Sequence, residues 1–235
     1  MVKKTLGFFL GLAIGSSGVF VYDQMQDRSH PSGFPVLERA GYTMSYDTRA
    51  KIPFWTHEHL TKNSLEVHVQ RDGMDFKEDA EIYPSHRSQL SDYYQSGFDR
   101  GHHAPAANHR LSEEELKQTF LLTNISPQDA QFNRGLWAKL EKTIRILAKE
   151  TEWVDVTTGP LFLAHDEADG KRVVTYQVIG KNDVAVPTHF FKVISTPERS
   201  WAYVIPNGPT KGSLNDYITP ISEIEKLAGI RLTNL

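Results

Sequence analysis

The stretch SGFDRGHHAPAANHR, residues 96–110, concentrates side chains that can catalyse hydrolysis. It holds two arginines, three histidines and an aspartate, together with two glycines and a proline. Because glycine and proline disfavour a regular helix, we expect Arg100, His102 and His103 to lie on a strand end or a loop. A loop held by a rigid scaffold is a common place for catalytic side chains. The segment is therefore the first candidate for an active site.

Four kinds of histidine chemistry compete for this segment. A zinc site is disfavoured because His102 and His109 are seven residues apart and the chain has no cysteine. A Ser-His-Asp hydrolase would need a Gly-x-Ser-x-Gly turn, which the sequence lacks. Hydrolysis of a phosphodiester would use all the parts, with histidine as the base, arginine for the phosphate charge and a hard cation on oxygen ligands. A purely structural role is the default for the remaining histidines, among them His57, His59, His68, His165 and His189.

A second set of polar residues follows on a predicted helix. In FNRGLWAKLEKTIRILAKE, residues 132–150, leucines and an isoleucine recur at helical spacing. Every fourth residue forms a slowly drifting stripe beside this apolar face: Asn133, Trp137, Glu141 and Arg145. Asn133 and Glu141 lie about 12 Å apart along an ideal helix axis, too far for both to bind one ion directly. One of them could bind a metal while the other holds a water.

Charge and composition leave nucleic-acid binding open. The chain has 235 residues, 39% of them hydrophobic, which is enough for a real core, and its formal net charge is −3. An interaction with nucleic acid would therefore depend on a local patch. The 132–150 segment has five basic and two acidic residues, a modest excess that also fits an ordinary solvated helix face. The absence of cysteine excludes disulfides and thiolate metal sites.

The elements that must position these residues follow from hydrophobic periodicity. Alternating or β-branched runs predict strands at 64–70, 152–159, 172–180, 189–196 and 201–206. Helices are predicted at 112–120, where Ser112 and Glu115 have capping-box spacing, at 132–150 and around 221–229. Strands flanking central helices without strict alternation favour an α+β fold with a mostly antiparallel sheet.

The N-terminus predicts a membrane-targeting segment. Two lysines precede an uncharged, mostly apolar run from Thr5 to Tyr22, so residues 1–22 fit either a cleaved signal or a retained anchor. Residues 23–40 contain proline and glycine without periodicity and are interpreted as a linker. The remainder, 41–235, is the expected catalytic domain, and a chain that starts near Ser45 is expected to stay soluble and active.

Several motifs together resemble the family of DNA/RNA non-specific endonucleases, most closely its endonuclease G branch. They are DRGHHAPAANHR, TFLLTNISPQ, NRGLWAKLE, TGPLFL, ADGKRVVTYQVIGKNDVAVPTHFFKVI and VIPN, and the likeness runs from about Tyr42 to the C-terminus. The resemblance implies a ββα-metal motif in which a hairpin and the long helix hold one Mg²⁺, with Mn²⁺ as a substitute. It also implies a homodimer that cleaves DNA and RNA and leaves 5′-phosphate ends.

The resemblance also implies roles for individual residues. His102 would be the general base, Asn133 the direct protein ligand of the metal, and Glu141 would act through a metal-bound water. Arg100 would pair with the scissile phosphate, and Asn124 would help to order the site. Three further residues have lesser roles: Asp99 braces the loop, while Arg145 and Arg87 are candidate phosphate contacts.

His103 departs from the family pattern, which more often has an apolar residue there. It leaves a second imidazole beside the base, either exposed at the surface or able to alter the pH profile. If residues 100–103 are extended, Arg100 and His102 share one face, while Asp99, Gly101 and His103 share the other. His109 is expected to be structural or on the surface.

Two alternatives to the endonuclease remain at this point. One is a 5′ exonuclease of the same fold, and the other is a nucleic-acid-binding protein that has lost hydrolysis. The expected location is exported or membrane-anchored, in a bacterial periplasm or a mitochondrial intermembrane space.

Overall fold

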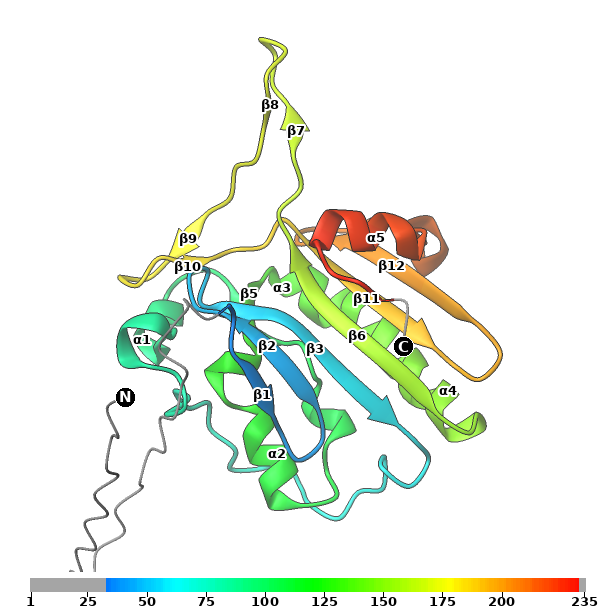
Figure 1. Cartoon of the computed structure of the whole chain (residues 1–235). Coiled ribbons are helices and arrows are strands. Elements are labelled where there is room, and N and C mark those ends of the chain that lie inside the picture. The colour runs from blue at the N-terminus through cyan, green and yellow to red at the C-terminus, as the bar shows by residue number, and fades with distance from the viewer. Residues whose placement is uncertain (1–32, 233–235) are drawn as a thin grey trace, which may run out of the picture. The chain divides into compact units, whose positions relative to one another are not determined.

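A six-stranded antiparallel sheet is the main sheet of the residues that the structure describes (Figure 1). The computed structural model describes residues 33–232. The strand order is β1-β2-β3-β6-β11-β12, and every neighbouring pair is antiparallel. The strands are β1 (Val36–Glu38), β2 (Thr43–Asp47), β3 (Ile52–Leu60), β6 (Val154–Leu161), β11 (His189–Ser195) and β12 (Ser200–Pro206). The expected α+β fold with a mostly antiparallel sheet is confirmed.

Helices cover both faces of this sheet. Along β11, Phe190 and Ile194 pack in one apolar cluster with residues of α4 (Ala138–Glu150). Phe191 and Val193, at the alternate positions, pack in another cluster with α5 (Ile221–Ala228). The two-residue period of the strand therefore directs apolar side chains to both faces. Because both faces of β11 are buried, the strand is a rigid support for what packs against it.

Shorter elements lie around the sheet. Three further α-helices in the described part of the chain are short: α1 (Leu90–Tyr93), α2 (Glu113–Thr119) and α3 (Ala130–Phe132). The same part also has four 3-10 turns, η1 (Pro84–His86), η2 (Ala106–Asn108), η3 (Leu122–Asn124) and η5 (Leu214–Tyr217). A π-helical turn, η4 (Asn133–Trp137), joins α3 to α4. Two-stranded pairs are formed by β4 (Asp99–His102) with β5 (Ile125–Gln128), β7 (His165–Asp166) with β8 (Arg172–Val173), and β9 (Val178–Ile179) with β10 (Val184–Ala185). Ser112 caps α2, since its side chain accepts a hydrogen bond from the Glu115 amide at 3.2 Å.

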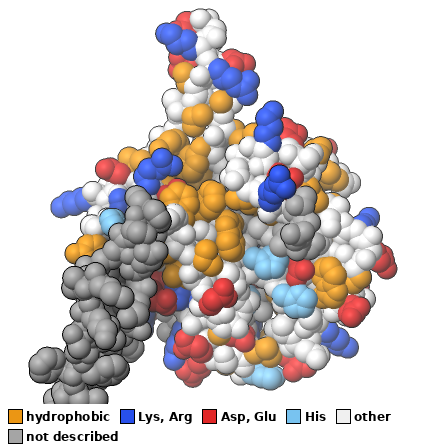
Figure 2. Space-filling view, in the orientation of Figure 1, with side chains coloured by type: hydrophobic (Ala, Val, Ile, Leu, Met, Phe, Trp, Pro, Cys, Tyr) orange, Lys and Arg blue, Asp and Glu red, His pale blue; other side chains and the backbone are white. Residues whose placement is uncertain are grey.

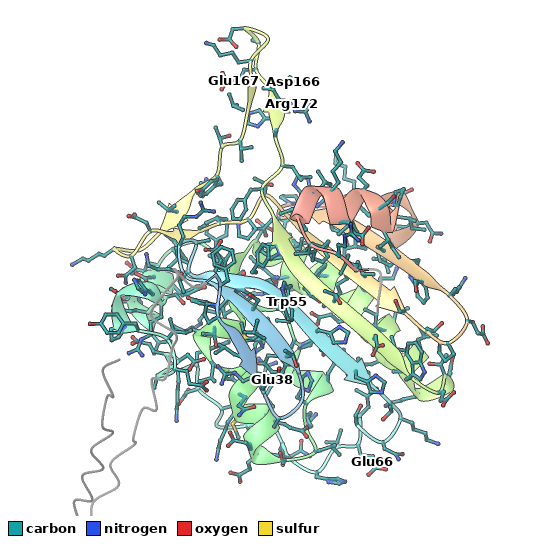
Figure 3. The ribbon with its side chains drawn as sticks, in the orientation of Figure 1. Glu38, Trp55, Glu66, Asp166, Glu167 and Arg172 are labelled. Carbon is teal, nitrogen blue, oxygen red and sulfur yellow. The ribbon has the colours of Figure 1, made fainter. Side chains whose placement is uncertain are left out.

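The β7–β8 hairpin projects away from the body (Figure 1). Its tip is charged, and Asp166, Glu167 and Arg172 point outward there (Figure 3). At its base, apolar side chains gather on the surface (Figure 2), and Tyr176 and Val178 are about half exposed. None of the residues of this hairpin lines the cleft described below.

The structure differs from three predictions about elements and their boundaries. Residues 64–70 form turns and loop, in which His68 and Val69 donate backbone hydrogen bonds to the Arg110 carbonyl, so their alternation does not produce a strand. Residues 172–180 form only the short strands β8 and β9, because most of this run lies in the projecting hairpin with no long neighbour to pair with. The expected linker 23–40 ends earlier, because β1 adds to the sheet edge and the Leu37 side chain is buried.

The predicted membrane-targeting segment, 1–22, lies outside the described residues. Within 33–232, no helix is long and apolar enough to cross a membrane.

Candidate active site

Strand β4 positions the histidine-rich segment 96–110. It pairs with β5 in antiparallel register, with Gly101 opposite Ser126 and His102 opposite Ile125. A Cβ atom at Gly101 would lie 2.1 Å from the side chain of Gln128, so this close approach requires glycine. Arg100 is exposed on this strand, while Gly101 is buried. The expected location on a strand end is confirmed.

His103 lies on the opposite side from His102, as the alternation predicted. It is fully buried, its Nε2 atom lies 2.7 Å from the Ser126 hydroxyl, and its ring packs edge-to-face on Phe190. Burial lowers its pKa to about 3, so the ring is neutral at pH 7. The idea of an exposed second imidazole is therefore wrong, because this ring belongs to the sheet core.

A cleft of about 520 Å³ collects most of the expected site residues. It lies between β4, η2 and the helical segment formed by η4 and α4. The ionisable and amide side chains that line it are Arg71, Asp99, Arg100, His102, Asn133, Arg134, Glu141 and Arg145. The alternation of an extended strand predicts that Asp99 faces away from His102, but Asp99 also lines this cleft. Its position at the start of β4 lets its carboxylate reach η4.

The His102 ring is packed between aromatic side chains and is not bound by a carboxylate of the described residues. Its ring lies 5.4 Å from that of Phe76 and 5.2 Å from that of Phe120, measured between centroids. Its Nε2 atom is buried without a partner among residues 33–232. Burial, with a smaller contribution from the Arg71 charge, lowers the pKa of His102 to about 3. The imidazole is therefore neutral at pH 7 and able to accept a proton.

Asp99 orients Asn133. The Asn133 carboxamide donates from Nδ2 to Oδ2 of Asp99 at 2.9 Å, and Arg134 grips both oxygens of that carboxylate at 2.8 and 2.6 Å. These contacts hold the pKa of Asp99 below its usual value despite partial burial. With its nitrogen engaged, Asn133 retains its amide oxygen as an acceptor. These hydrogen bonds tie the start of β4 to η4, and the role of Asp99 in bracing the loop stays a prediction.

A π-helical turn changes the predicted stripe of polar residues. Gly135 has non-helical dihedral angles within η4, and Trp137 is buried against Phe132 and Phe190 instead of facing the cleft. Ala138 lines the cleft in its place. A π-turn spaces residues on one face five apart, so the period of four fails at this point. Such turns are frequent at functional sites.

Glu141 lies near the positive charges of Lys192 and Arg145. Burial raises its pKa to about 7, while the nearby positive charges of Lys192 and Arg145 act in the opposite direction. Lys192 is buried and donates to the Thr158 hydroxyl at 2.6 Å and to the His103 carbonyl at 3.3 Å. This lysine links the strand end that holds His102 with the sheet beneath the cleft.

Arg145 reaches the cleft from α4 and is held by Asn108. Its Nη1 donates to Asn108 Oδ1 at 3.1 Å, and the Asn108 amide donates to the buried carboxylate of Glu58 at 2.7 Å. His109 binds the same Glu58 oxygen at 3.0 Å and is buried, which confirms a structural place for this histidine.

Two expected site residues do not line the cleft. Asn124 is buried, where its amide accepts from the Ala104 nitrogen at 3.0 Å and donates to the Ala104 and Thr119 carbonyls. It therefore clamps the chain just after His103. Arg87 donates to the Asp79 and Ile82 carbonyls and pairs with Glu78, so the structure does not bring it to the cleft.

Sequence reasoning missed Arg71. This exposed side chain lines the cleft from the 70–77 loop, with its guanidinium 5.3 Å from the Phe120 ring centroid. A strand was predicted for the preceding residues, and Arg71 lies 29 positions before Arg100 with no motif joining them. Only the fold reveals that the loop returns to the cleft.

The cleft has the parts needed to cleave a phosphodiester. It combines a neutral imidazole, several guanidinium groups, and a carboxamide beside a carboxylate. Residues 33–232 contain no group of three or more His, Cys, Asp or Glu placed to hold a metal ion. A metal here would thus be held by few protein atoms and keep most of its waters, as Mg²⁺ commonly does. These features define a nuclease-type site.

Comparisons with known proteins agree with this class. The sequence profile of the DNA/RNA non-specific endonuclease family matches residues 25–235, and the chain belongs to this family. It is 44% identical over 207 residues to mitochondrial endonuclease G of Bos taurus, covering 85% of this chain and 69% of that protein. It is 45% identical over 204 residues to nuclease C1 of Cunninghamella echinulata var. echinulata, covering 83% and 81%.

A solved structure gives the same result. The crystal structure of an EndoG/EndoGI complex, described as showing the mechanism of EndoG inhibition, superimposes with a TM-score of 0.81 at 43% identity. The alignment covers 86% of this chain and 87% of that chain. The resemblance to the endonuclease G branch is confirmed. As a member of a nuclease family, the protein is a hydrolase of the endonuclease class.

Proposed function

We propose that the protein is a divalent-metal-dependent, sugar-non-specific endonuclease that cleaves DNA and RNA and leaves 5′-phosphate ends. The observation that carries this proposal is the convergence of His102, Arg100, Asn133 and Glu141 on one cleft from three separate elements. Both sugars fit because the charged groups of the cleft suit the phosphate, which DNA and RNA share.

In this mechanism, His102 removes a proton from the attacking water. Its ring is neutral above its low pKa, and a bound phosphate beside it stabilises the imidazolium that forms. Arg100, Arg71 and Arg145 hold the phosphate and neutralise the charge that develops on it. Asn124 keeps the chain around His102 in place from beneath the cleft.

The residues present fit a hard cation. Asn133 offers an amide oxygen fixed by Asp99, and Glu141 offers a carboxylate in the same cleft. A bound Mg²⁺, or Mn²⁺ as its substitute, would stabilise the departing 3′ oxygen. Asn133 is the proposed direct ligand, and Glu141 is proposed to hold a water of the ion.

The variant Asn133→Ala tests the metal assignment. We expect it to keep its fold and to lose most metal-dependent cleavage, because one carboxamide among waters has no protein substitute. Plasmid nicking is measured across a Mg²⁺ titration, with binding of Mn²⁺ followed separately by electron paramagnetic resonance. Full activity and unchanged Mn²⁺ affinity in this variant would overturn the assignment.

Endonucleolytic cleavage is distinguished from 5′ exonuclease action by the substrate. Closed circular DNA has no end, so nicking of a supercoiled plasmid supports the endonuclease, whereas digestion of linear DNA alone supports the exonuclease. Cleavage of neither the plasmid nor linear DNA would support the silent binding protein.

A homodimer and a mitochondrial location complete the proposal. Relatives are named mitochondrial nucleases, and mitochondrial targeting accommodates an N-terminal segment that is either cleaved or retained as an anchor. Sedimentation equilibrium tests the dimer. Fractionation of mitochondria from the native source, with carbonate extraction, separates an intermembrane-space protein from a membrane-anchored one.

A further inference from the structure

Phe76 touches two proposed catalytic groups. It lines the cleft from the 70–77 loop and is half-buried. The guanidinium carbon of Arg100 lies 4.6 Å from the centroid of its ring, and the ring of His102 lies 5.4 Å away. One aromatic side chain thus contacts both the proposed base and the proposed phosphate ligand.

The contact leaves the Arg100 charge available to a substrate. Among residues 33–232, the Arg100 side chain has neither an acidic partner nor a hydrogen bond, whereas Arg134 is paired with Asp99. A cation over an aromatic face is attracted by the ring quadrupole without losing its charge to a counterion. The Phe76 ring can therefore fix the guanidinium and leave its donors directed at phosphate.

The same ring restricts His102. Phe76 and Phe120 contact each other at 5.1 Å and both contact the imidazole, with Phe120 edge-to-face at an interplanar angle of 85°. No described carboxylate binds the imidazole. Ring packing, with its geometric preferences, therefore orients the imidazole on the strand that carries it.

The backbone makes Phe76 a firm support. The next residue, Lys77, donates to the Phe120 carbonyl at 3.0 Å, and its own carbonyl accepts from the Leu122 nitrogen at 2.8 Å. These bonds form a parallel bridge between the loop and the end of α2. Phe76 and Phe120 are consequently held side by side.

We propose that Phe76 is a positioning residue that sets both His102 and Arg100 for attack on the phosphate. This inference rests on the proposed function, which assigns chemistry to those two side chains. It adds a residue that acts through them, since Phe76 has no group that can donate or accept a proton.

The first test compares Phe76→Met with Phe76→Tyr. Met keeps apolar volume but removes the ring, so kcat for plasmid nicking should fall about 10- to 100-fold, in the range expected for misplaced reacting groups. Phe76→Tyr retains the ring, so its kcat should stay within about threefold of the wild-type value. Phe162→Met is the matched control, because Phe162 is also a partly buried ring but lines a different pocket.

The second test alters the electronic character of the ring with only a small change in its size. Trifluorophenylalanine at position 76 makes the face of the ring less negative, which weakens its attraction for the Arg100 guanidinium. We therefore expect a higher KM for plasmid nicking, or a higher Kd for an oligonucleotide measured in the absence of metal, with unchanged folding. A double-mutant cycle of Phe76→Met with Arg100→Ala should be non-additive in kcat/KM, because the two changes remove one contact.

The outcomes separate this inference from the function on which it rests. Failure of the wild-type protein to nick DNA would reject the proposed function. If the wild type nicks DNA but Phe76→Met loses no more activity than Phe162→Met, only the positioning role is rejected. If Phe76→Met does not fold, the variant with trifluorophenylalanine at position 76 provides the test. Unchanged KM and Kd in that variant would overturn the proposal.

Discussion

The amide of Asn133 and the carboxylate of Asp99 are joined by a hydrogen bond of 2.9 Å, which connects η4 to β4 across the cleft. Because this bond engages the amide nitrogen of Asn133, the amide oxygen is the atom that can bind a metal. Asp99 is not a proposed metal ligand, but it orients the proposed ligand Asn133.

Removing this support should weaken activation by metal. In Asp99→Ala, the Asn133 amide is free to rotate, so the Mg²⁺ concentration for half-maximal nicking should rise about 10- to 100-fold. Arg134→Ala is the matched control, because it removes the exposed partner of Asp99 but keeps the bond to Asn133. Equal metal requirements in the two variants would contradict the orienting role.

The start of the folded domain can be tested by truncation. A chain of residues 33–235 keeps β1 and should be soluble and active. A chain that starts at Ser45 loses β1 and buried Met44, and it removes Arg39, whose guanidinium pairs with the buried carboxylate of Asp79. Leaving such a charge unpaired typically costs about 3–5 kcal/mol.

We therefore revise the expectation that a start near Ser45 suffices. The shorter chain should melt well below the longer one in circular dichroism, with lower soluble yield. Equal melting temperatures for the two chains would show that the β1 edge and the Arg39 pair contribute little.

Acid should destabilise the protein partly through His103. Its pKa is lowered to about 3 in the folded state from an ordinary value of 6.5, so below pH 6.5 the unfolded state binds more protons than the folded state. The stabilisation from keeping this ring neutral is full above pH 6.5 and declines as the pH falls toward 3. His102 behaves in the same way.

His103→Gln removes one of these two titrations while offering a polar group to Ser126. Its free energy of unfolding, from urea titrations between pH 7 and pH 4, should depend less steeply on pH than that of the wild type. Parallel curves for the two proteins would mean that His103 does not titrate as proposed.

Local patterns predicted much of the fold and the site. The alternation along β4 correctly separated His102 from His103, because strand geometry has a fixed period of two. The capping residue Ser112 and the amphipathic segment at α4 also lie where their patterns indicated. These features depend on neighbours in the sequence.

Features that depend on distant contacts were not predictable. A period of four places Trp137 on the polar stripe, but η4 shifts the helical period, and Trp137 is buried in the core beside Phe190. The 70–77 loop, with Arg71 and Phe76, reaches the cleft through backbone hydrogen bonds and aromatic contacts with residues at the end of α2. A polar, glycine-containing loop carries no periodic pattern that would reveal such contacts.

The most direct test of the central claim compares three histidine variants. His102→Ala, His103→Ala and His109→Ala are purified, their folding is confirmed by circular dichroism, and cleavage of plasmid and RNA is measured at fixed Mg²⁺ and salt. His102→Ala should lose about 10²- to 10⁴-fold in rate on both substrates, as expected for removal of a general base. The two buried structural histidines should affect stability far more than kcat in protein that remains folded. If folded His102→Ala cuts at the wild-type rate while His103→Ala is inactive, the assignment of the base and of the cleft would both be wrong.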